Sequence, residues 1–246
     1  MNQLRVEYVS KRFGGLLALH NVSFETDHEI LGLIGPNGAG KTTLFNVISG
    51  FLPPSEGEVY YKGRSIHRYR PHQIVEMGIA RTFQIVKPFS DLTVMENVLS
   101  GYGMPKYPSW TAFSERYNIP QNRKAAVEIL DLTGLSRWAA SPARELPIGL
   151  QRRLEIARAL ATGPDFLLLD EPAAGLVSHE AQELSELIKT LHEQGKNIIV
   201  IEHNMSFAMN LCQRVIVLAQ GEIIARGTPA EIQADERVIN AYLGQE

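Results

Sequence analysis

The chain of 246 residues has little cysteine, no long apolar run and no excess of basic charge. Its single cysteine, Cys212, excludes a disulfide within the chain and suits a reducing compartment such as the cytosol. Its longest apolar runs, such as FLLL at 166–169 and NIIVI at 197–201, have the length of a strand. A membrane span needs ~20 apolar residues. The N-terminus also lacks the apolar core of a signal peptide. We therefore expect no membrane span, and expect another chain to hold this one at a membrane if it acts there.

The charge balance argues against a nucleic-acid partner. Lysine and arginine total 24 and aspartate and glutamate total 27, which gives a net charge of −3. A nucleic-acid-binding domain usually carries a clear basic excess. With 44% hydrophobic and 21% charged residues the composition is that of a soluble globular protein, long enough to bury a real core.

Short β-rich segments alternate with helical ones over most of the chain. We expect strands at 3–9, 18–26, 29–35, 57–63, 165–170, 197–201 and 214–219, with a hairpin-like return at 222–226. We expect helices at 41–49, 179–194 and 204–212, and short capped helices within 228–246. Strands that alternate with helices favour a mainly parallel sheet covered on both faces.

The segment 87–163 interrupts this alternation. It contains three helical patterns, at 93–100, 121–133 and 149–161, and a long loop between the first two. We therefore predict a single domain, 1–246, in which 1–86 and 164–246 form the core and 87–163 forms a helical subdomain inserted into it.

The stretch GPNGAGKTT matches the P-loop pattern G-x-x-x-x-G-K-[ST], which wraps the phosphates of a nucleotide. It follows a predicted strand and opens a predicted helix, which is the context that such a loop requires. Its glycines let backbone N–H groups point at phosphate oxygens, and the helix N-terminus adds positive potential. Lys41 would reach the β- and γ-phosphates, and Thr42 would hold Mg²⁺. The predicted nucleotide-binding residues here are Gly35, Pro36, Asn37, Gly38, Ala39, Gly40, Lys41, Thr42 and Thr43.

The run FLLLDE at 166–171 is an apolar strand that ends in two carboxylates. We expect Asp170 to lie beside the P-loop and to hold Mg²⁺ through water, and Glu171 to orient the water that attacks the γ-phosphate. Taken alone, the same run is also typical of a strand that ends in a polar turn. Together with the P-loop it predicts an ATPase.

The order of these motifs resembles the ATP-binding subunit of an ABC transporter, over nearly all of the chain. The resemblance implies an α/β fold: a P-loop NTPase core, with a mainly parallel sheet, helices on both faces and an antiparallel β subdomain, plus a helical insertion. It also implies roles for three further residues. Gln84, in RTFQ, would sense Mg²⁺ and the γ-phosphate. His203, in IEHNM, would hydrogen-bond the γ-phosphate, and Phe13, in KRFGG, would stack on adenine.

Within that family, RTFQIVKPF, LTVMENV and LQRRLEIARALAT are most similar to subunits of branched-chain amino-acid uptake systems. This implies a peripheral subunit on the cytoplasmic face of the inner membrane, bound to membrane-spanning permease subunits. Tyr102, Tyr107, Trp110 and Phe113, in or beside the long loop, would either contact the permease or fold back on the helical subdomain. Other readings stay open: an ABC ATPase for lipid, lipopolysaccharide, urea or an amide, or a soluble ABC-type ATPase not coupled to transport.

In the family, each nucleotide lies between the P-loop of one chain and the signature, usually LSGGQ, of a second chain. Here the stretch is LPIGLQ, with Pro147 at the position of the serine. The helix N-terminus is kept, and Pro147, Gly149 and Gln151 are the predicted contacts to the partner's nucleotide. Proline offers neither a hydroxyl nor an N–H. Losing one charge-assisted hydrogen bond of about 1.5–3 kcal/mol weakens closure roughly 10- to 150-fold.

A second departure is Val177, at a position where the family usually has aspartate. Both departures lie on the side that this chain would offer to a partner, whereas its own P-loop side is intact. Two arrangements remain open: a heterodimer, in which a partner supplies an intact signature, and a homodimer, in which the Gly149 backbone and the helix N-terminus suffice. We favour the heterodimer.

Overall fold

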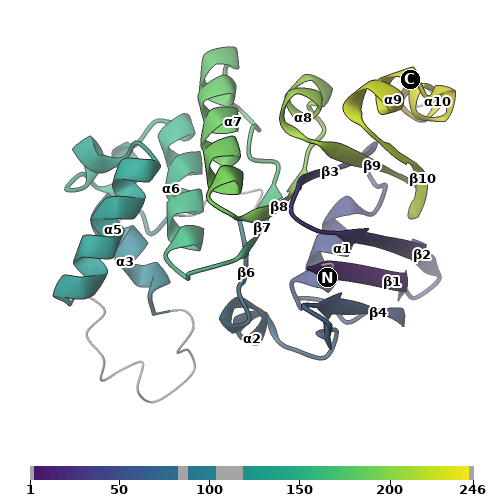
Figure 1. The fold of residues 1–246 in the computed structure, drawn as a ribbon, viewed down its shortest axis with the longest axis horizontal. Helices are drawn as coiled ribbons and strands as arrows, with labels where there is room; N and C mark the ends of the chain where they lie inside the picture. Colours follow the sequence, from purple (N-terminus) through teal and green to yellow (C-terminus); the bar gives the residue numbers. More distant parts are fainter. Residues whose placement is uncertain (1–2, 83–87, 104–118, 244–246) are drawn as a thin grey trace.

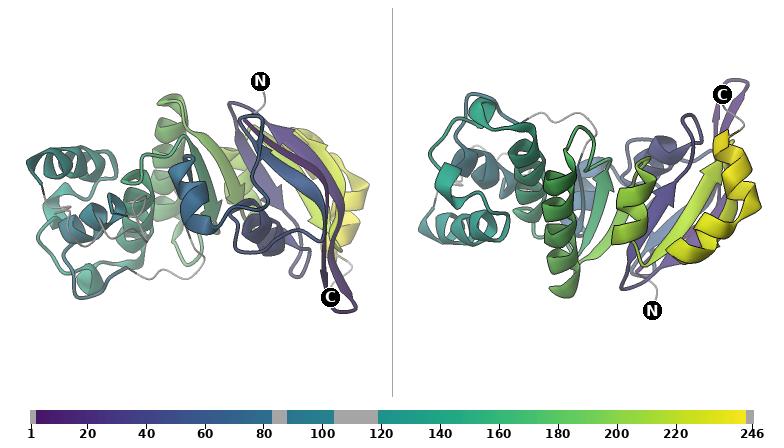
Figure 2. Two further views of the ribbon diagram at one scale, coloured as in Figure 1. Left: turned by 90° about the horizontal axis from the view of Figure 1, so that it is seen from below. Right: turned by 90° about the horizontal axis from the view of Figure 1, so that it is seen from above.

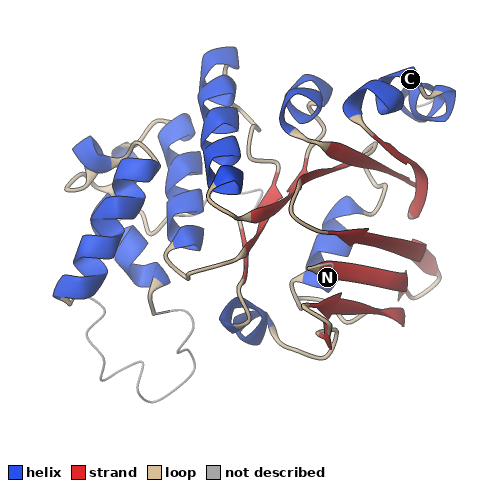
Figure 3. Cartoon of the chain, in the orientation of Figure 1, coloured by secondary structure: helices blue, strands red, loops and turns tan. Residues whose placement is uncertain are grey.

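The computed structural model describes residues 3–82, 88–103 and 119–243. The chain forms two β-sheets with helices packed around them, and a helical part lies at one end (Figure 1). Figure 3 shows the same division by element type, with most strands gathered at the end opposite to α3 and α5.

The larger sheet has six strands in the order β10-β9-β3-β8-β7-β6. Its strands are β3 (Ile30–Ile34), β6 (Ile79–Arg81), β7 (Phe166–Asp170), β8 (Asn197–Ile201), β9 (Arg214–Ala219) and β10 (Glu222–Gly227). All neighbouring strands are parallel except the β9–β10 pair, which is the predicted return. Every residue of β3, β7 and β8 is buried, as expected for strands covered on both faces.

The two faces of this sheet are covered by different elements. Alternate residues such as Leu33, Leu168 and Ile199 pack with α1 (Lys41–Ile48) and with the second sheet. The residues between them, such as Leu167 and Ile198, pack with helices α7 (Ser178–Glu193) and α8 (Met205–Leu211). Figure 2 shows helices on either side of the strands. The predicted parallel sheet with both faces covered is therefore present.

The second sheet is antiparallel, with the order β2-β1-β4-β5. Its strands are β1 (Leu4–Phe13), β2 (Leu16–Thr26), β4 (Glu56–Tyr61) and β5 (Arg64–Ser65). Strand β1 continues four residues beyond the predicted end because Lys11, Arg12 and Phe13 pair with β2 in a tight hairpin. This sheet packs its apolar face on α1 and so frames the segment that follows β3.

The helical part consists of α3 (Val94–Gly101), α5 (Pro120–Leu132) and α6 (Ile148–Leu160), with short 3-10 helices η2 (Ser136–Trp138) and η3 (Ala143–Glu145). These elements share an apolar cluster of their own, which includes Val98, Leu130 and Leu154. Each helix begins within one residue of its predicted start.

The chain ends in two short helices, α9 (Pro229–Ala234) and α10 (Glu236–Leu243), as predicted. The Thr228 side chain caps α9 by accepting from the N–H of Glu231. The sequence prediction contains no counterpart of α2 (Pro71–Glu76) or β6, which are six and three residues long, or of the shorter β5, η2 and η3. Among the described residues, no helix is long and apolar enough to cross a membrane.

Candidate functional site

The predicted P-loop, residues 35–40, connects β3 to α1 and is packed tightly from both sides. Gly35 has φ +149°, and a Cβ atom there would lie 2.0 Å from the carbonyl oxygen of Leu218. Gly40 has φ +101°, and a Cβ atom there would lie 2.6 Å from the carbonyl oxygen of Ala18. These two glycines are therefore required by the backbone and its neighbours. Asn37 and Gly38, at the tip, are exposed, whereas Pro36 and Ala39 are buried.

Lys41 is the first residue of α1, and its side chain folds back over this loop. Its ammonium group donates hydrogen bonds to the carbonyl oxygens of Gly35 at 2.7 Å and Pro36 at 2.9 Å. Burial lowers the pKa of Lys41, and the charges of Glu171 and Asp170 oppose that shift. The cation is thus held where a nucleotide's phosphates would meet the loop. Thr42 is exposed and Thr43 is partly buried.

The parallel strands bring three distant segments to the edge where the P-loop begins. Strands β3, β8 and β7 are neighbours, so the residues that follow each of them meet at one end of the sheet. Glu171 follows β7, and its N–H donates to the carbonyl oxygen of Ile201 at 3.0 Å. Its Oε2 lies 3.5 Å from Nδ1 of His203, which follows β8. Two residues that lie 32 positions apart in the printed sequence are therefore side by side.

Glu171 has a left-handed backbone, with φ +49°. Such a conformation is uncommon for a residue other than glycine and needs surrounding structure to hold it. The hydrogen bond to Ile201 is part of that support. The side chain of Glu171 is largely buried, whereas about half of the His203 side chain is exposed.

Asp170 is the last residue of β7, and its side chain is 2% exposed. One oxygen, Oδ2, accepts a hydrogen bond from Nη2 of Arg81 at 2.8 Å. The other, Oδ1, is buried and has no hydrogen-bond partner among the described residues. Burial raises the pKa of Asp170, and the Arg81 hydrogen bond opposes that shift. A buried oxygen without a partner costs free energy unless a ligand satisfies it. With the Thr42 hydroxyl it supplies the hard oxygen donors that Mg²⁺ prefers, so these residues fit that ion.

The sequence prediction missed two charged residues of this site, Arg81 and Glu202. Glu202 lies between Ile201 and His203 and is 1% exposed. Its carboxylate accepts hydrogen bonds from the N–H groups of Ala173 at 2.9 Å and Asn204 at 3.4 Å. It therefore joins the turn after Glu171 to the segment that carries His203. Burial raises the pKa of Glu202, and these two N–H groups oppose that shift.

Phe13 lies at the end of β1 and is 45% exposed, with the Lys11 ammonium 5.3 Å from its ring centroid. An exposed ring face is what stacking on a base requires, although no described contact joins Phe13 to the P-loop. Gln84, Tyr107, Trp110 and Phe113 lie outside the described residues, whereas Tyr102 packs against the apolar cluster of the helical part.

The signature stretch is placed away from the P-loop of its own chain. Figures 1 and 2 show α6 beside α3 and α5, with α1 on the far side of β7 and β8. Pro147 precedes α6, and no side chain caps that helix. The Gln151 side chain donates to the carbonyl oxygen of Leu146 at 2.8 Å. Gly149 is buried against α7, where a Cβ atom would lie 2.8 Å from Oε1 of Glu180. No contact among the described residues joins Pro147, Gly149 or Gln151 to the P-loop.

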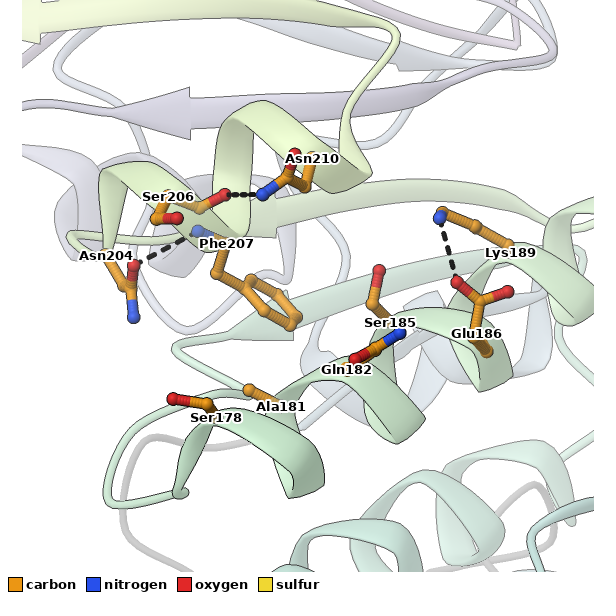
Figure 4. A pocket seen from close by; sticks show the side chains of 10 residues that line it. All are labelled: Ser178, Ala181, Gln182, Ser185, Glu186, Lys189, Asn204, Ser206, Phe207 and Asn210. Atoms are coloured by element: carbon orange, nitrogen blue, oxygen red, sulfur yellow. Dashed lines mark hydrogen bonds and ion pairs between the residues drawn. The ribbon is translucent and has the colours of Figure 1, made fainter.

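A separate hollow of about 510 Å³ lies between α7 and α8 (Figure 4). Four of its polar side chains make hydrogen bonds or ion pairs within the chain. Glu186 pairs with Lys189 at 3.0 Å, Asn204 accepts from the N–H of Phe207, and Asn210 donates to the carbonyl oxygen of Ser206. Ser185 and Gln182 are two of the other polar residues that line it. This hollow therefore lacks the convergent charges that the edge of the sheet has.

Known proteins are similar to this chain in sequence and in fold. The family model for ABC transporters matches residues 19–174, and that for branched-chain amino acid ATP-binding cassette transporters matches residues 222–246. The high-affinity branched-chain amino acid transport ATP-binding protein LivG of Salmonella typhimurium is 44% identical, over 98% of each chain.

Two solved structures extend the comparison. The ADP conformation of an ATP-binding cassette from an ABC transporter matches with a TM-score of 0.91 and 34% identity, over 100% of both chains. A dimeric, post-hydrolysis state of another cassette, bound to ADP and Pi, matches with a TM-score of 0.77 and 29% identity. That match covers 92% of this chain and 98% of the other. The predicted fold class and the resemblance are confirmed, and this chain belongs to the ABC transporter family as one of its ATP-binding, ATP-hydrolysing chains.

Proposed function

We propose that this chain is the ATPase subunit of an importer for branched-chain or related hydrophobic amino acids. It would act on the cytoplasmic face of the inner membrane, bound to membrane-spanning permease subunits. The observation that carries the ATPase chemistry is the meeting of Lys41, Asp170, Glu171 and His203 at one edge of the parallel sheet. The substrate class is supported by the likeness to LivG and by the family match over the C-terminal segment.

The geometry indicates a role for each of these residues in binding the phosphates and in hydrolysis. The N–H groups of the P-loop would hold the phosphates, and Lys41 would exchange the carbonyls of Gly35 and Pro36 for phosphate oxygens. Glu171 would orient the attacking water, and His203, 3.5 Å from it, would hydrogen-bond the γ-phosphate.

Mg²⁺, when bound, supplies charge that stabilises the developing negative charge on the phosphate oxygens. Thr42 and Asp170 would hold it, together with Gln84. Phe13 would stack on adenine.

We further propose that the chain works with a second, different ATP-binding subunit. Three features on its signature side support this. Pro147 lacks an N–H, and the Gln151 amide is engaged by Leu146. The Glu180 carboxylate lies against Gly149, close to the helix N-terminus that a partner's γ-phosphate would approach. A carboxylate there opposes the approach of another anion.

The assembly is tested by the mass in solution of the purified Glu171→Gln chain, with and without ATP and Mg²⁺. Glutamine at this position should block hydrolysis and so preserve any closed dimer. We expect a monomer that binds ATP over a wide range of concentrations, because LPIGLQ is a poor phosphate clamp. A dimer that forms only with ATP would contradict the heterodimer and establish a working homodimer.

The substrate is tested by uptake in a bacterium that lacks its own branched-chain amino-acid importers. We expect radiolabelled leucine uptake when the chain is expressed with the other subunits of its transporter, and none when Glu171→Gln replaces it. Uptake of urea or an amide in place of leucine, or export of lipid, would contradict the proposed substrate class. ATPase activity that no permease stimulates would favour a soluble ATPase.

A further inference from the structure

Arg81 is a buried arginine that joins three elements around the carboxylate of Asp170. It is the last residue of β6 and lies beside Leu168 of the neighbouring strand β7. Its Nη2 donates to Oδ2 of Asp170 at 2.8 Å. Its Nη1 donates to Oδ1 of Asn46, on α1, at 2.7 Å and to Oγ of Ser49, at the end of α1, at 3.0 Å. The guanidinium therefore connects the strand that ends in Asp170 to the helix that begins at Lys41.

The packing around this guanidinium fixes its position. Its side chain is 6% exposed. Its central carbon lies 5.5 Å from the ring centroid of Phe45 and 5.8 Å from that of Phe51. The Ser49 hydroxyl donates to the carbonyl oxygen of Phe45, which leaves its oxygen turned to accept from Arg81. Aromatic faces and hydrogen-bond acceptors thus hold the planar group from several directions.

Stability alone does not account for a charge pair this deeply buried. Removing two ions from water costs several kcal/mol each, and an apolar pair of similar volume is often as stable or more so. The pair also leaves Oδ1 of Asp170 buried and without a partner among the described residues. An arrangement made only for stability would satisfy both oxygens.

We propose that Arg81 is a positioning residue: by holding Oδ2 of Asp170, it fixes Oδ1 as the oxygen that this chain turns toward Mg²⁺. A carboxylate with one oxygen held has little freedom to rotate. Mg²⁺ tolerates little departure from octahedral geometry, so a fixed oxygen suits it better than a mobile one. The inference rests on the proposed binding of Mg²⁺ with ATP and concerns only how this chain presents its own ligand.

The test compares nucleotide affinity with and without Mg²⁺ in Arg81→Met, which keeps much of the stem and removes the donors. The probe is a β,γ-imido ATP analogue, titrated calorimetrically in excess EDTA and in excess Mg²⁺. Loss of a partner that orients a metal ligand typically costs 10- to 100-fold in metal affinity. We expect the gain in nucleotide affinity due to Mg²⁺ to fall about tenfold or more, while the Kd in EDTA stays within about threefold of wild type.

The control is Arg214→Met, which removes an ion pair with Glu29 at the opposite end of the strands. It should leave the Mg²⁺ gain unchanged. If Arg81→Met fails to fold, Arg81→Lys provides the same test. A single ammonium group does not replace a guanidinium whose two Nη atoms donate to Asp170 and to Asn46.

Three results would count against the proposal or its basis. An unchanged Mg²⁺ gain in Arg81→Met, or in Arg81→Lys where that variant takes its place, would overturn the positioning role. Equal weakening of binding in EDTA and in Mg²⁺ would show that Arg81 acts only on structure. A wild-type chain with no Mg²⁺ gain at all would instead count against the proposed ATPase site.

Discussion

Replacing Glu171 with glutamine is expected to lower kcat for ATP hydrolysis by at least about 100-fold, the lower part of the range that a positioned acid or base contributes. The carboxylate follows β7, and its backbone is held by the hydrogen bond from its N–H to Ile201. Its Oε2 lies 3.5 Å from His203. Glutamine has nearly the same shape, so it keeps this placement but does not accept a proton from water.

Phosphate release from the assembled complex measures the loss, and calorimetry with ATP shows whether binding is retained. We expect the Kd for ATP to stay within about threefold of wild type, because no P-loop residue is changed. Glu183→Gln is the matched control: this carboxylate is exposed on α7 and pairs with Arg153 rather than with a residue of the P-loop or with His203, so turnover should remain within about twofold.

The same measurement also shows whether one or both nucleotide sites of a dimer hydrolyse ATP. In a complex with a different second ATP-binding chain, loss of nearly all turnover would mean that the site built on this chain's P-loop is the one that hydrolyses ATP; a homodimer would lose the same activity, because both of its copies carry the substitution. Retention of about half would mean that the two sites are equivalent and would contradict the proposed asymmetry.

The parts of the site that could be predicted are those formed by residues that are consecutive in the sequence. Gly35 to Lys41 form a local motif between a strand and a helix, and Asp170 and Glu171 directly follow a continuous apolar strand. The parallel pairing of β3, β8 and β7 then brings their ends together, and no further information is needed.

Arg81 and Glu202 could not be predicted in this way, because tertiary neighbours define their roles. Arg81 meets Asp170 across 89 positions, and Glu202 meets Ala173 across 29. The only sequence signal for Arg81 is an arginine directly after two apolar residues, which is equally typical of a surface position. Strand β6 itself has three residues, too few for a period to be recognised, and is extended because it pairs with β7.

The burial and hydrogen bonds of Lys41 indicate how the Lys41→Ala substitution should affect stability. Lys41 is 7% exposed, and its ammonium group donates to two carbonyl oxygens of its own loop. Burial disfavours its charge, whereas Asp170 and Glu171 favour it. Because the pKa of Lys41 is lowered overall, its charge adds no stability to the nucleotide-free chain. We therefore expect Lys41→Ala to remain folded, with a melting temperature within a few degrees of wild type.

Nucleotide binding should respond very differently to Lys41→Ala. Each charge-assisted hydrogen bond from the ammonium group to a phosphate oxygen contributes about 1.5–3 kcal/mol, which corresponds to roughly 10- to 150-fold in Kd. Because the cation already lies over the P-loop, it needs only to exchange carbonyl oxygens for phosphate oxygens, so little of that free energy is lost to rearrangement. We expect the Kd for ATP, measured by calorimetry, to rise by about 100-fold, while Lys62→Ala, an exposed lysine paired with Asp165, leaves it unchanged. An affinity within about threefold of wild type in a folded Lys41→Ala chain would mean that the backbone N–H groups of the loop hold the phosphates without the lysine.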